Sequence, residues 1–315
     1  MYTRDHIGIV VESAQRRISI FDINTFEVLQ QIPLDADILD VAITNDCTRA
    51  FVTSFNSMTM FQIDLCARPA RVVGSAVSST FLEDVALTPD GKYALSVDGS
   101  ASNQDIVSYS SRQNVFVSAL PTGAQAVAIS PESRELVLTA EFFNNSVRRF
   151  VINPNGSLED TGQSIPAGTN PINIIFSPCG QFAFVANSNN SNSGISVLST
   201  LIPQNVTLLG STPSSDNPQS LTVSRDGRHV FALTASNVDI YAFDPVAGSL
   251  TLKRSFAHGL TITSYYGVDQ IALDACGTRL FISAAGQVAV FTTYGLPLGR
   301  VLGAEGPGGI AICPA

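Results

Sequence analysis

A short apolar run, a polar turn and a second apolar run recur along the chain. The first copy is VAITNDCTRAFVT, and the last is the truncated IAICPA at the C-terminus. The copies begin at Val41, Val85, Val127, Ile174, Leu221, Ile271 and Ile310. Successive starts lie 39 to 50 residues apart. Self-similarity with a period of about 45 residues is typical of the blades of a β-propeller.

Each repeat predicts four β-strands. The clearest copy reads SLTVS, HVFALT, VDIYAFD and SLTLKRSF between residues 220 and 256. Asp226-Gly227 and Asp244-Pro245 supply turn residues between these strands. Hardly any stretch carries the 3.6-residue apolar period of a helix. The pattern therefore predicts an all-β chain.

The two ends of the chain complement each other. Joining them would place Val41 46 residues after Ile310, which is within the spacing of the other repeats. GGIAIC should then be the inner strand of a blade whose other strands are IGIVVES, RISIFDI and EVLQQIPL. We predict one seven-bladed propeller domain over residues 1–315, in which residues 5–35 and 308–315 share blade 1. The other blades start near residues 39, 83, 125, 172, 219 and 269. An open stack of sheets is the structural alternative.

Composition narrows the function classes. The 315 residues are 45% hydrophobic and only 14% charged, whereas an average soluble domain has about 25% charged residues. A net charge of -9 argues against nucleic-acid binding, which needs a basic surface. No apolar run approaches the ~18 residues of a membrane span. We therefore expect neither nucleic acid nor a membrane span.

The cysteines and the N-terminus suggest a compartment. Five cysteines, at positions 47, 66, 179, 276 and 313, show neither close pairs nor zinc-ligand spacing. Free thiols fit a reducing environment. The first residues, MYTRDHIGIVVES, lack the basic and apolar regions of a signal peptide. These observations favour a cytoplasmic location.

Two phrases carry a family resemblance. SPCGQFAFVANSNNSNSGISVLS (177–199) and TPDGKYALSVDGS (88–100) resemble YVTN-type β-propeller repeats, and more distantly the propellers of the 6-phosphogluconolactonase type. The likeness covers nearly the whole chain and implies a WD40-like fold. It would imply lactonase activity if the relatives' Arg-His pair were present. The matching positions read NPIN (170–173) and NPQS (217–220), so no residue of that site carries over.

Polar residues precede the inner strands on one face of the predicted ring, where loops held by rigid strands often bind ligands. They are Asp40, Asp84, Gln125, Asn173, Gln219, Asp269 and Gln270. Crowded acids repel one another, so a cation or a cationic partner would be stabilising at this channel mouth. The alternative is a ring of solvated side chains around a water-filled channel.

A catalytic set is harder to assemble. His258 lies in a long loop with Tyr265 and Tyr266, which could act as a base and as oxyanion donors. Glu141 and Asp84 are further groups to test. The alternative for His258 is a hydrogen-bonded surface residue.

Metal and cofactor motifs are absent from the sequence or incomplete. Asp98–Asp105 lacks the glycine and acid positions of a calcium loop, and the oxygens of Asp35, Asp37 and Asp40 form a better cluster. There is no P-loop, nucleophile elbow or dinucleotide fingerprint. We expect no cofactor and no specific metal site.

These observations together predict a non-catalytic scaffold that binds a protein, a peptide or a small ligand at the acidic channel mouth. The alternative is a lactonase-like hydrolase, or a lyase or isomerase, acting on a small metabolite. A third hypothesis is an assembly protein whose exposed outer strands pair with neighbours.

Overall fold

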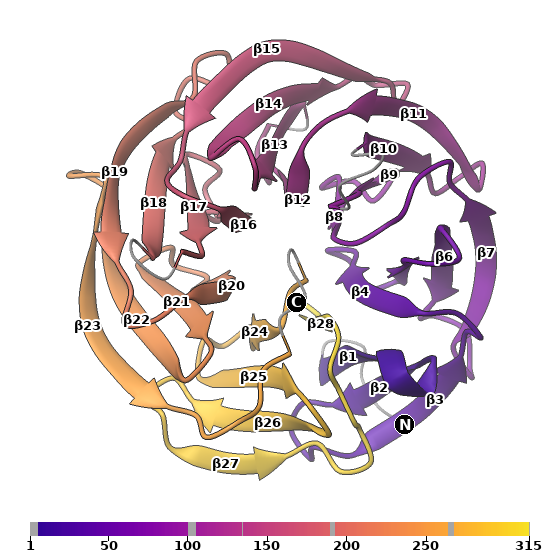
Figure 1. Ribbon diagram of the computed structural model, residues 1–315. Coiled ribbons are helices and arrows are strands. Elements are labelled where there is room, and N and C mark those ends of the chain that lie inside the picture. The colour runs from indigo at the N-terminus through magenta and orange to yellow at the C-terminus, as the bar shows by residue number, and fades with distance from the viewer. Residues whose placement is uncertain (1–5, 100–104, 134, 190–192, 264–267, 315) are drawn as a thin grey trace.

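Seven sheets surround one axis in the computed structural model, which describes residues 6–99, 105–133, 135–189, 193–263 and 268–314 (Figure 1). Each sheet has four antiparallel strands. Within the described ranges the one helical element is a 3-10 turn, η2 (Ser13–Gln15). The predicted all-β fold, a propeller of seven four-stranded blades, is confirmed.

The strands are given from the axis outward. Blade 1 contains β28 (Ile310–Ile312), β1 (Ile7–Glu12), β2 (Arg17–Asp22) and β3 (Val28–Pro33). Blade 2 contains β4 (Ile38–Ile43), β5 (Arg49–Ser54), β6 (Thr59–Asp64) and β7 (Arg71–Val77). Blade 3 contains β8 (Val85–Leu87), β9 (Tyr93–Val97), β10 (Asp105–Ser110) and β11 (Val115–Pro121). Blade 4 contains β12 (Ala124–Ile129), β13 (Leu136–Glu141), β14 (Ser146–Ile152) and β15 (Leu158–Pro166).

The remaining blades follow the same order. Blade 5 contains β16 (Pro171–Phe176), β17 (Phe182–Asn187), β18 (Gly194–Ser199) and β19 (Thr207–Pro213). Blade 6 contains β20 (Pro218–Val223), β21 (His229–Thr234), β22 (Asn237–Asp244) and β23 (Ser249–Ala257). Blade 7 contains β24 (Ile271–Leu273), β25 (Arg279–Ala284), β26 (Gln287–Thr292) and β27 (Pro297–Arg300).

Blade 1 closes the ring. Its inner strand β28 comes from the C-terminus and pairs with β1 through Gly8 and Ile312, Ile9 and Ala311, and Val10 and Ile310. The other three strands of the blade come from the N-terminal segment (Figure 1). The shared blade inferred from the repeat spacing is therefore present, and it removes the open edges that an unclosed stack would expose.

The core lies between neighbouring blades. All six residues of β1 and of β17 are buried, whereas all four residues of β27 are exposed. Between blades 1 and 2, apolar side chains of Ile9, Ile20 and Val52 pack into one cluster. Inner strands covered on both faces explain why the chain has so few charged residues, since an unpaired charge between two sheets would be strongly unfavourable.

The third and fourth strands of every blade pair with a register shift. It lies between Ile20 and Phe21 in blade 1 and between Gln62 and Ile63 in blade 2, and the corresponding pairs in the other five blades are shifted too. A bulge bends and twists the outer strand, which makes its free edge a poorer template for another strand.

Cys47 and Cys313 form a disulfide bond, with their Cα atoms 5.6 Å apart. The prediction that these thiols are free is wrong. Cys47 follows β4 and Cys313 follows β28, and closure of the ring brings together residues that are 266 positions apart in the sequence. Spacing along the chain could not reveal such a pair. Cys66, Cys179 and Cys276 are exposed and are not in disulfide bonds.

No helix in the described residues is long and apolar enough to cross a membrane.

Candidate functional site

The residue just before the repeated apolar phrase links neighbouring blades. Asp40 accepts a hydrogen bond from the Val85 N–H at 3.2 Å, and Asp84 accepts one from the Val127 N–H at 2.7 Å. In blades 5 and 6 the same position is filled by Asn173 and Ser220, which accept from the backbone of the next blade at 3.1 Å. The side chains at this position therefore have a structural function, since they satisfy backbone donors around the axis.

Three carboxyl groups converge at this end of the inner strands. One oxygen from each of Asp40, Asp84 and Asp269 lies within 4.8 Å of the other two, and no other such group of His, Cys, Asp or Glu occurs in the part of the chain that the structure describes. Asp40 and Asp84 are buried, whereas Asp269 keeps partial contact with solvent. We refer to these three residues as the aspartate triad.

Blade 1 allows the triad to form, because it lies between blades 7 and 2 in the ring and presents only glycine there. A Cβ atom at Gly309 would overlap Asp40 Oδ1 and would lie 2.8 Å from Asp40 Cα. Asp269 and Asp40 can therefore approach one another across this blade. The sequence signal was the Gly308-Gly309 pair, whose meaning depends on knowing that it faces two carboxylates.

Burial and mutual repulsion hold the triad partly protonated. Desolvation, together with the charge of Asp269, raises the pKa of Asp40 to about 8, although the Val85 N–H opposes this rise. Desolvation and the charges of Asp269 and Asp40 raise the pKa of Asp84 well above its usual range. The interaction between the two carboxyl groups lowers the pKa of Asp40 slightly and raises that of Asp84 further. The pair therefore keeps at least one proton at neutral pH.

Asp269 is the more acidic member of the triad. Desolvation raises its pKa to about 6, and a 3.0 Å hydrogen bond from the Asn173 amide limits this rise. At neutral pH Asp269 is therefore mostly ionised. None of the salt bridges formed by the described residues involves the triad. The negative charge of Asp269 therefore has no salt-bridge partner among the described residues.

The other predicted mouth residues are buried rather than exposed on a rim. Gln125 donates to the Gly99 carbonyl at 2.6 Å, and Asn173 joins Asp269 to the backbone of blade 6. Gln219 is 9% exposed. Gln270 is fully buried, and neither polar atom of its amide has a hydrogen-bond partner among the described residues.

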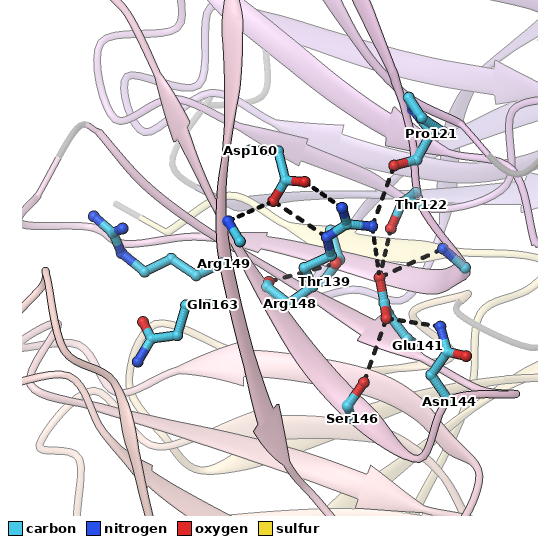
Figure 2. A network of polar contacts seen from close by, with 12 residues as sticks. Pro121, Thr122, Thr139, Glu141, Asn144, Ser146, Arg148, Arg149, Asp160 and Gln163 are labelled. Carbon is cyan, nitrogen blue, oxygen red and sulfur yellow. Dashed lines mark hydrogen bonds and ion pairs between the residues drawn. The ribbon is translucent and has the colours of Figure 1, made fainter.

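Glu141 belongs to a separate network, in blade 4 (Figure 2). Its carboxylate accepts from Thr122, Asn144 and Ser146 at 2.9 to 3.3 Å. Arg148 lies 3.7 Å from the same carboxylate and also forms a bidentate ion pair with Asp160. Every oxygen of Glu141 is thus occupied, which gives this buried acid a structural explanation.

His258 is buried, and both of its ring nitrogens face backbone groups. The Leu260 N–H donates to Nδ1 at 3.0 Å, so Nε2 carries the proton and donates to the Thr234 carbonyl at 3.2 Å. Burial lowers the pKa of His258. A neutral imidazole with both nitrogens engaged is poorly placed to act as a base. Tyr265 and Tyr266, predicted as its partners, lie outside the described residues.

The structure separates the members of one candidate calcium ligand set and describes only part of the other. Asp37 pairs with Arg16 at 3.1 Å and accepts from Asn56, away from Asp40. Asp35, Asp37 and Asp40 therefore do not share one site. In the Asp98–Asp105 segment, residues 100–104 lie outside the described residues, and Asp98 is buried and accepts from Thr80 at 2.5 Å.

Comparisons with known proteins place the fold. No family model matches the chain, and no curated protein does either, so the resemblance to YVTN-type repeats stays a prediction. The fold is similar to that of the Pseudomonas aeruginosa periplasmic gluconolactonase, with 14% identity, a TM-score of 0.78 and coverage of 97% of this chain and 98% of that one. A candidate 6-phosphogluconolactonase from Bacteroides fragilis NCTC 9343 matches with 15% identity, a TM-score of 0.75 and 99% of both chains. These likenesses confirm the 6-phosphogluconolactonase-like propeller architecture.

One solved structure is far more similar in sequence. A functionally unknown protein from Desulfotomaculum acetoxidans DSM 771 shares 42% identity over 98% of this chain and 99% of its own, with a TM-score of 0.94. The chain therefore belongs to the family of this Desulfotomaculum acetoxidans protein, a family of seven-bladed β-propellers.

Proposed function

We propose that this propeller is a binding protein that holds a cation, or the cationic group of a ligand, at Asp40, Asp84 and Asp269. The observation that carries this proposal is the convergence of three carboxyl groups, two of them buried, with no salt bridge to them from the described residues. Such a cluster is unfavourable by itself, because desolvated like charges repel. A bound cation would reverse the sign of that interaction.

The spacing suits a metal ion of calcium size. Oxygen ligands lie about 2.3–2.6 Å from Ca²⁺, so two ligands on opposite sides of one ion are about 5 Å apart. The triad oxygens fall within 4.8 Å of one another. An ammonium or guanidinium group would be held by the same charges through hydrogen bonds.

The test is a titration of the purified protein at pH 7.5 with CaCl₂, MgCl₂ and MnCl₂, and separately with methylguanidine. We expect at least one of these cations to bind saturably in calorimetry and to raise the melting temperature. Binding should also release protons, because Asp40 and Asp84 must ionise to hold the cation. The released protons are measured by repeating the titration in buffers of different ionisation enthalpy.

Two variants make the result specific. Asp84→Asn should abolish saturable binding, while Asp35→Asn, the same substitution at an exposed carboxylate, should leave it unchanged. If none of the probes binds, or if Asp84→Asn binds as well as the wild type, the triad is a structural cluster and the proposal is wrong.

Hydrolysis of a small lactone is the alternative, and the observation that favours it is the fold shared with a gluconolactonase. We rank it second because His258 is occupied by backbone groups on both ring nitrogens. The direct test is hydrolysis of glucono-δ-lactone by the purified chain. We expect no rate above the spontaneous one, and a rate that His258→Gln abolishes would favour the enzyme.

The disulfide bond bears on the compartment. Bonds of this kind persist in oxidising environments and are rare in the cytosol. The Cys47–Cys313 pair therefore supports an oxidising compartment in place of the cytoplasm expected from the sequence. Alkylation of cysteines in freshly lysed cells, with and without prior reduction, would report whether this pair is oxidised in vivo.

A further inference from the structure

A second hollow lies between blades 6 and 7, at the end of the inner strands opposite the aspartate triad. It has a volume of about 750 Å³, within the range of small-molecule sites. Its lining includes the buried Phe231 and Ile240 and the exposed Tyr294. The first hairpins of the two blades, around Asp226 and Cys276, form its walls.

The charge of this hollow is opposite to that of the molecule. Arg225, Lys253 and Arg254 line it together with His229, and Asp226 is its one carboxylate. The whole chain carries a net charge of -9. A local group of three cations in such a chain produces a positive potential that attracts an anion to this hollow.

No ion pair between described residues neutralises the three cations. None of the salt bridges between described residues includes Arg225, Lys253 or Arg254. Asp226 is directed to its own hairpin, where it accepts from Ser224 Oγ at 2.6 Å and from the Arg228 N–H at 3.0 Å. These bonds lower the pKa of Asp226 and keep it occupied locally.

Part of the hollow is held in place by the neighbouring blade. Arg254 Nη1 donates to the Tyr294 carbonyl at 2.9 Å, which joins the outer strand of blade 6 to the turn after β26. One guanidinium edge thus fixes the side chain, and its other N–H groups stay available to a ligand. Arginine presents paired donors that match the oxygens of a phosphate or a carboxylate.

We propose that the hollow between blades 6 and 7 binds a small organic anion, with its phosphate or carboxylate on Arg225, Lys253 and Arg254 and its apolar or ring portion against Phe231, Ile240 and Tyr294. The site is independent of the aspartate triad, and it would add a second ligand of opposite charge on the opposite face. An anion without an apolar portion would use only half of it.

The experiment compares four probes at low salt: phenyl phosphate, benzoate, inorganic phosphate and phenol. Phenyl phosphate and benzoate carry both a charge and a ring, so a tighter dissociation constant for one of them identifies the preferred acid group. Inorganic phosphate and phenol each lack one half and should bind at least several-fold more weakly, as seen by calorimetry or ligand-observed NMR.

The matched variants keep net charge equal. Lys253→Gln/Arg254→Gln should weaken binding of the better aromatic anion by about tenfold or more. The control is Arg71→Gln/Arg112→Gln, which removes two exposed arginines from blades 2 and 3 and should leave binding unchanged. Equal weakening in both double variants would mean general electrostatic attraction, and would overturn the proposal.

Cys276 supplies a second, local readout, because its exposed thiol lines the hollow. The bound anion should slow alkylation of Cys276, but not of the exposed Cys66, as followed by peptide mass spectrometry. If a saturating concentration of the anion leaves the alkylation rate of Cys276 unchanged, the anion binds elsewhere. Asp84→Asn should retain this protection, so failure of the triad proposal and failure of this one can be told apart.

Discussion

Gly309 is the residue whose missing side chain matters most to the triad. Glycine is required at this position by the lack of space and not by the backbone conformation. A Cβ would overlap Asp40 Oδ1 and crowd the Asp40 backbone. Only glycine can therefore occupy this position without moving blade 2 relative to blade 1. The same gap in side chains brings Asp269 within reach of Asp40.

Gly309→Ala should lower the free energy of unfolding by about 1–3 kcal/mol, the usual cost of overpacking. It should also weaken cation binding, because Asp40 must move. Gly210→Ala is the control, since a Cβ there meets nothing within 4 Å. Urea unfolding measures the stability of the two variants, and calorimetry measures their cation binding. Equal stability of the two variants would contradict the close approach of Gly309 to Asp40.

Asp40 should also make stability depend on pH. Its pKa is about 8 in the folded chain and near 3.8 in the unfolded one. Between these values the folded state binds more protons, so stability should fall as the pH rises from 4 to 8. The slope from one such group is at most about 1.4 kcal/mol per pH unit.

Asp40→Asn should make this dependence less steep, although the raised pKa of Asp84 leaves part of it. It should also raise stability at pH 8, since the amide can still accept from the Val85 N–H without a charge. Urea unfolding at pH 5, 6, 7 and 8 without added metal measures the slope. Asp35→Asn, at an exposed carboxylate, should keep the wild-type slope. A wild-type slope in Asp40→Asn would show that the titrating group lies elsewhere.

Among the elements, β28 is one of the shortest strands, and it is the inner strand of the blade that closes the ring. It has three residues and pairs with one strand only, β1. The disulfide from Cys313 to Cys47 ties its end to the hairpin that follows β4. Covalent attachment therefore reinforces the one strand that closes the ring.

Cys47→Ala/Cys313→Ala should cost about 2–4 kcal/mol of stability. The wild type in dithiothreitol should melt at the temperature of this variant, as measured by circular dichroism. Cys66→Ala/Cys179→Ala, at two exposed thiols, is the control and should melt like the oxidised wild type. A reductant-insensitive wild type would mean that the bond contributes little.

The Glu141 network joins β13, β14 and β15 within blade 4 (Figure 2). Glu141→Gln should lower stability by about 1–3 kcal/mol, because a buried charged acceptor with several donors is replaced. Glu159→Gln, at an exposed position of β15, should have little effect. Cation binding and anion binding should be unchanged in both variants. Loss of either kind of binding in Glu141→Gln would mean that Glu141 belongs to a binding site.

At the scale of the whole molecule, the fold could be predicted almost completely. Blades repeat, so the turn signal of Asp226-Gly227 and the spacing of the apolar runs are seen several times, and even the shared blade follows from the wrap-around distance. What could not be predicted depends on closure. The Cys47–Cys313 pair and the approach of Asp269 to Asp40 join residues more than 200 positions apart, and the spacing of residues along the chain reveals neither contact.

The contacts of individual loop residues could not be predicted from the sequence either. Asp40, Asp84 and Asn173 were expected at an open mouth, yet they are buried and hold the backbone of the next blade. The sequence allows His258 to be either a base or a hydrogen-bonded residue, and the structure shows that both of its ring nitrogens are hydrogen-bonded. The outer-strand bulges also disfavour the edge-to-edge pairing that an assembly protein would need. Composition and spacing do not show which hydrogen bonds a side chain will make.

The disulfide has a topological consequence. Residues 47 to 313 form a covalent circle. Strands β1, β2 and β3 of blade 1 lie on the N-terminal tail that precedes this circle. A protease cutting once within the circle would leave a single covalent molecule, whereas a cut before Cys47 would free the tail to dissociate when the chain unfolds. On a denaturing gel without reductant, nicked molecules of the first kind would migrate as one species, and reductant alone would resolve them into fragments.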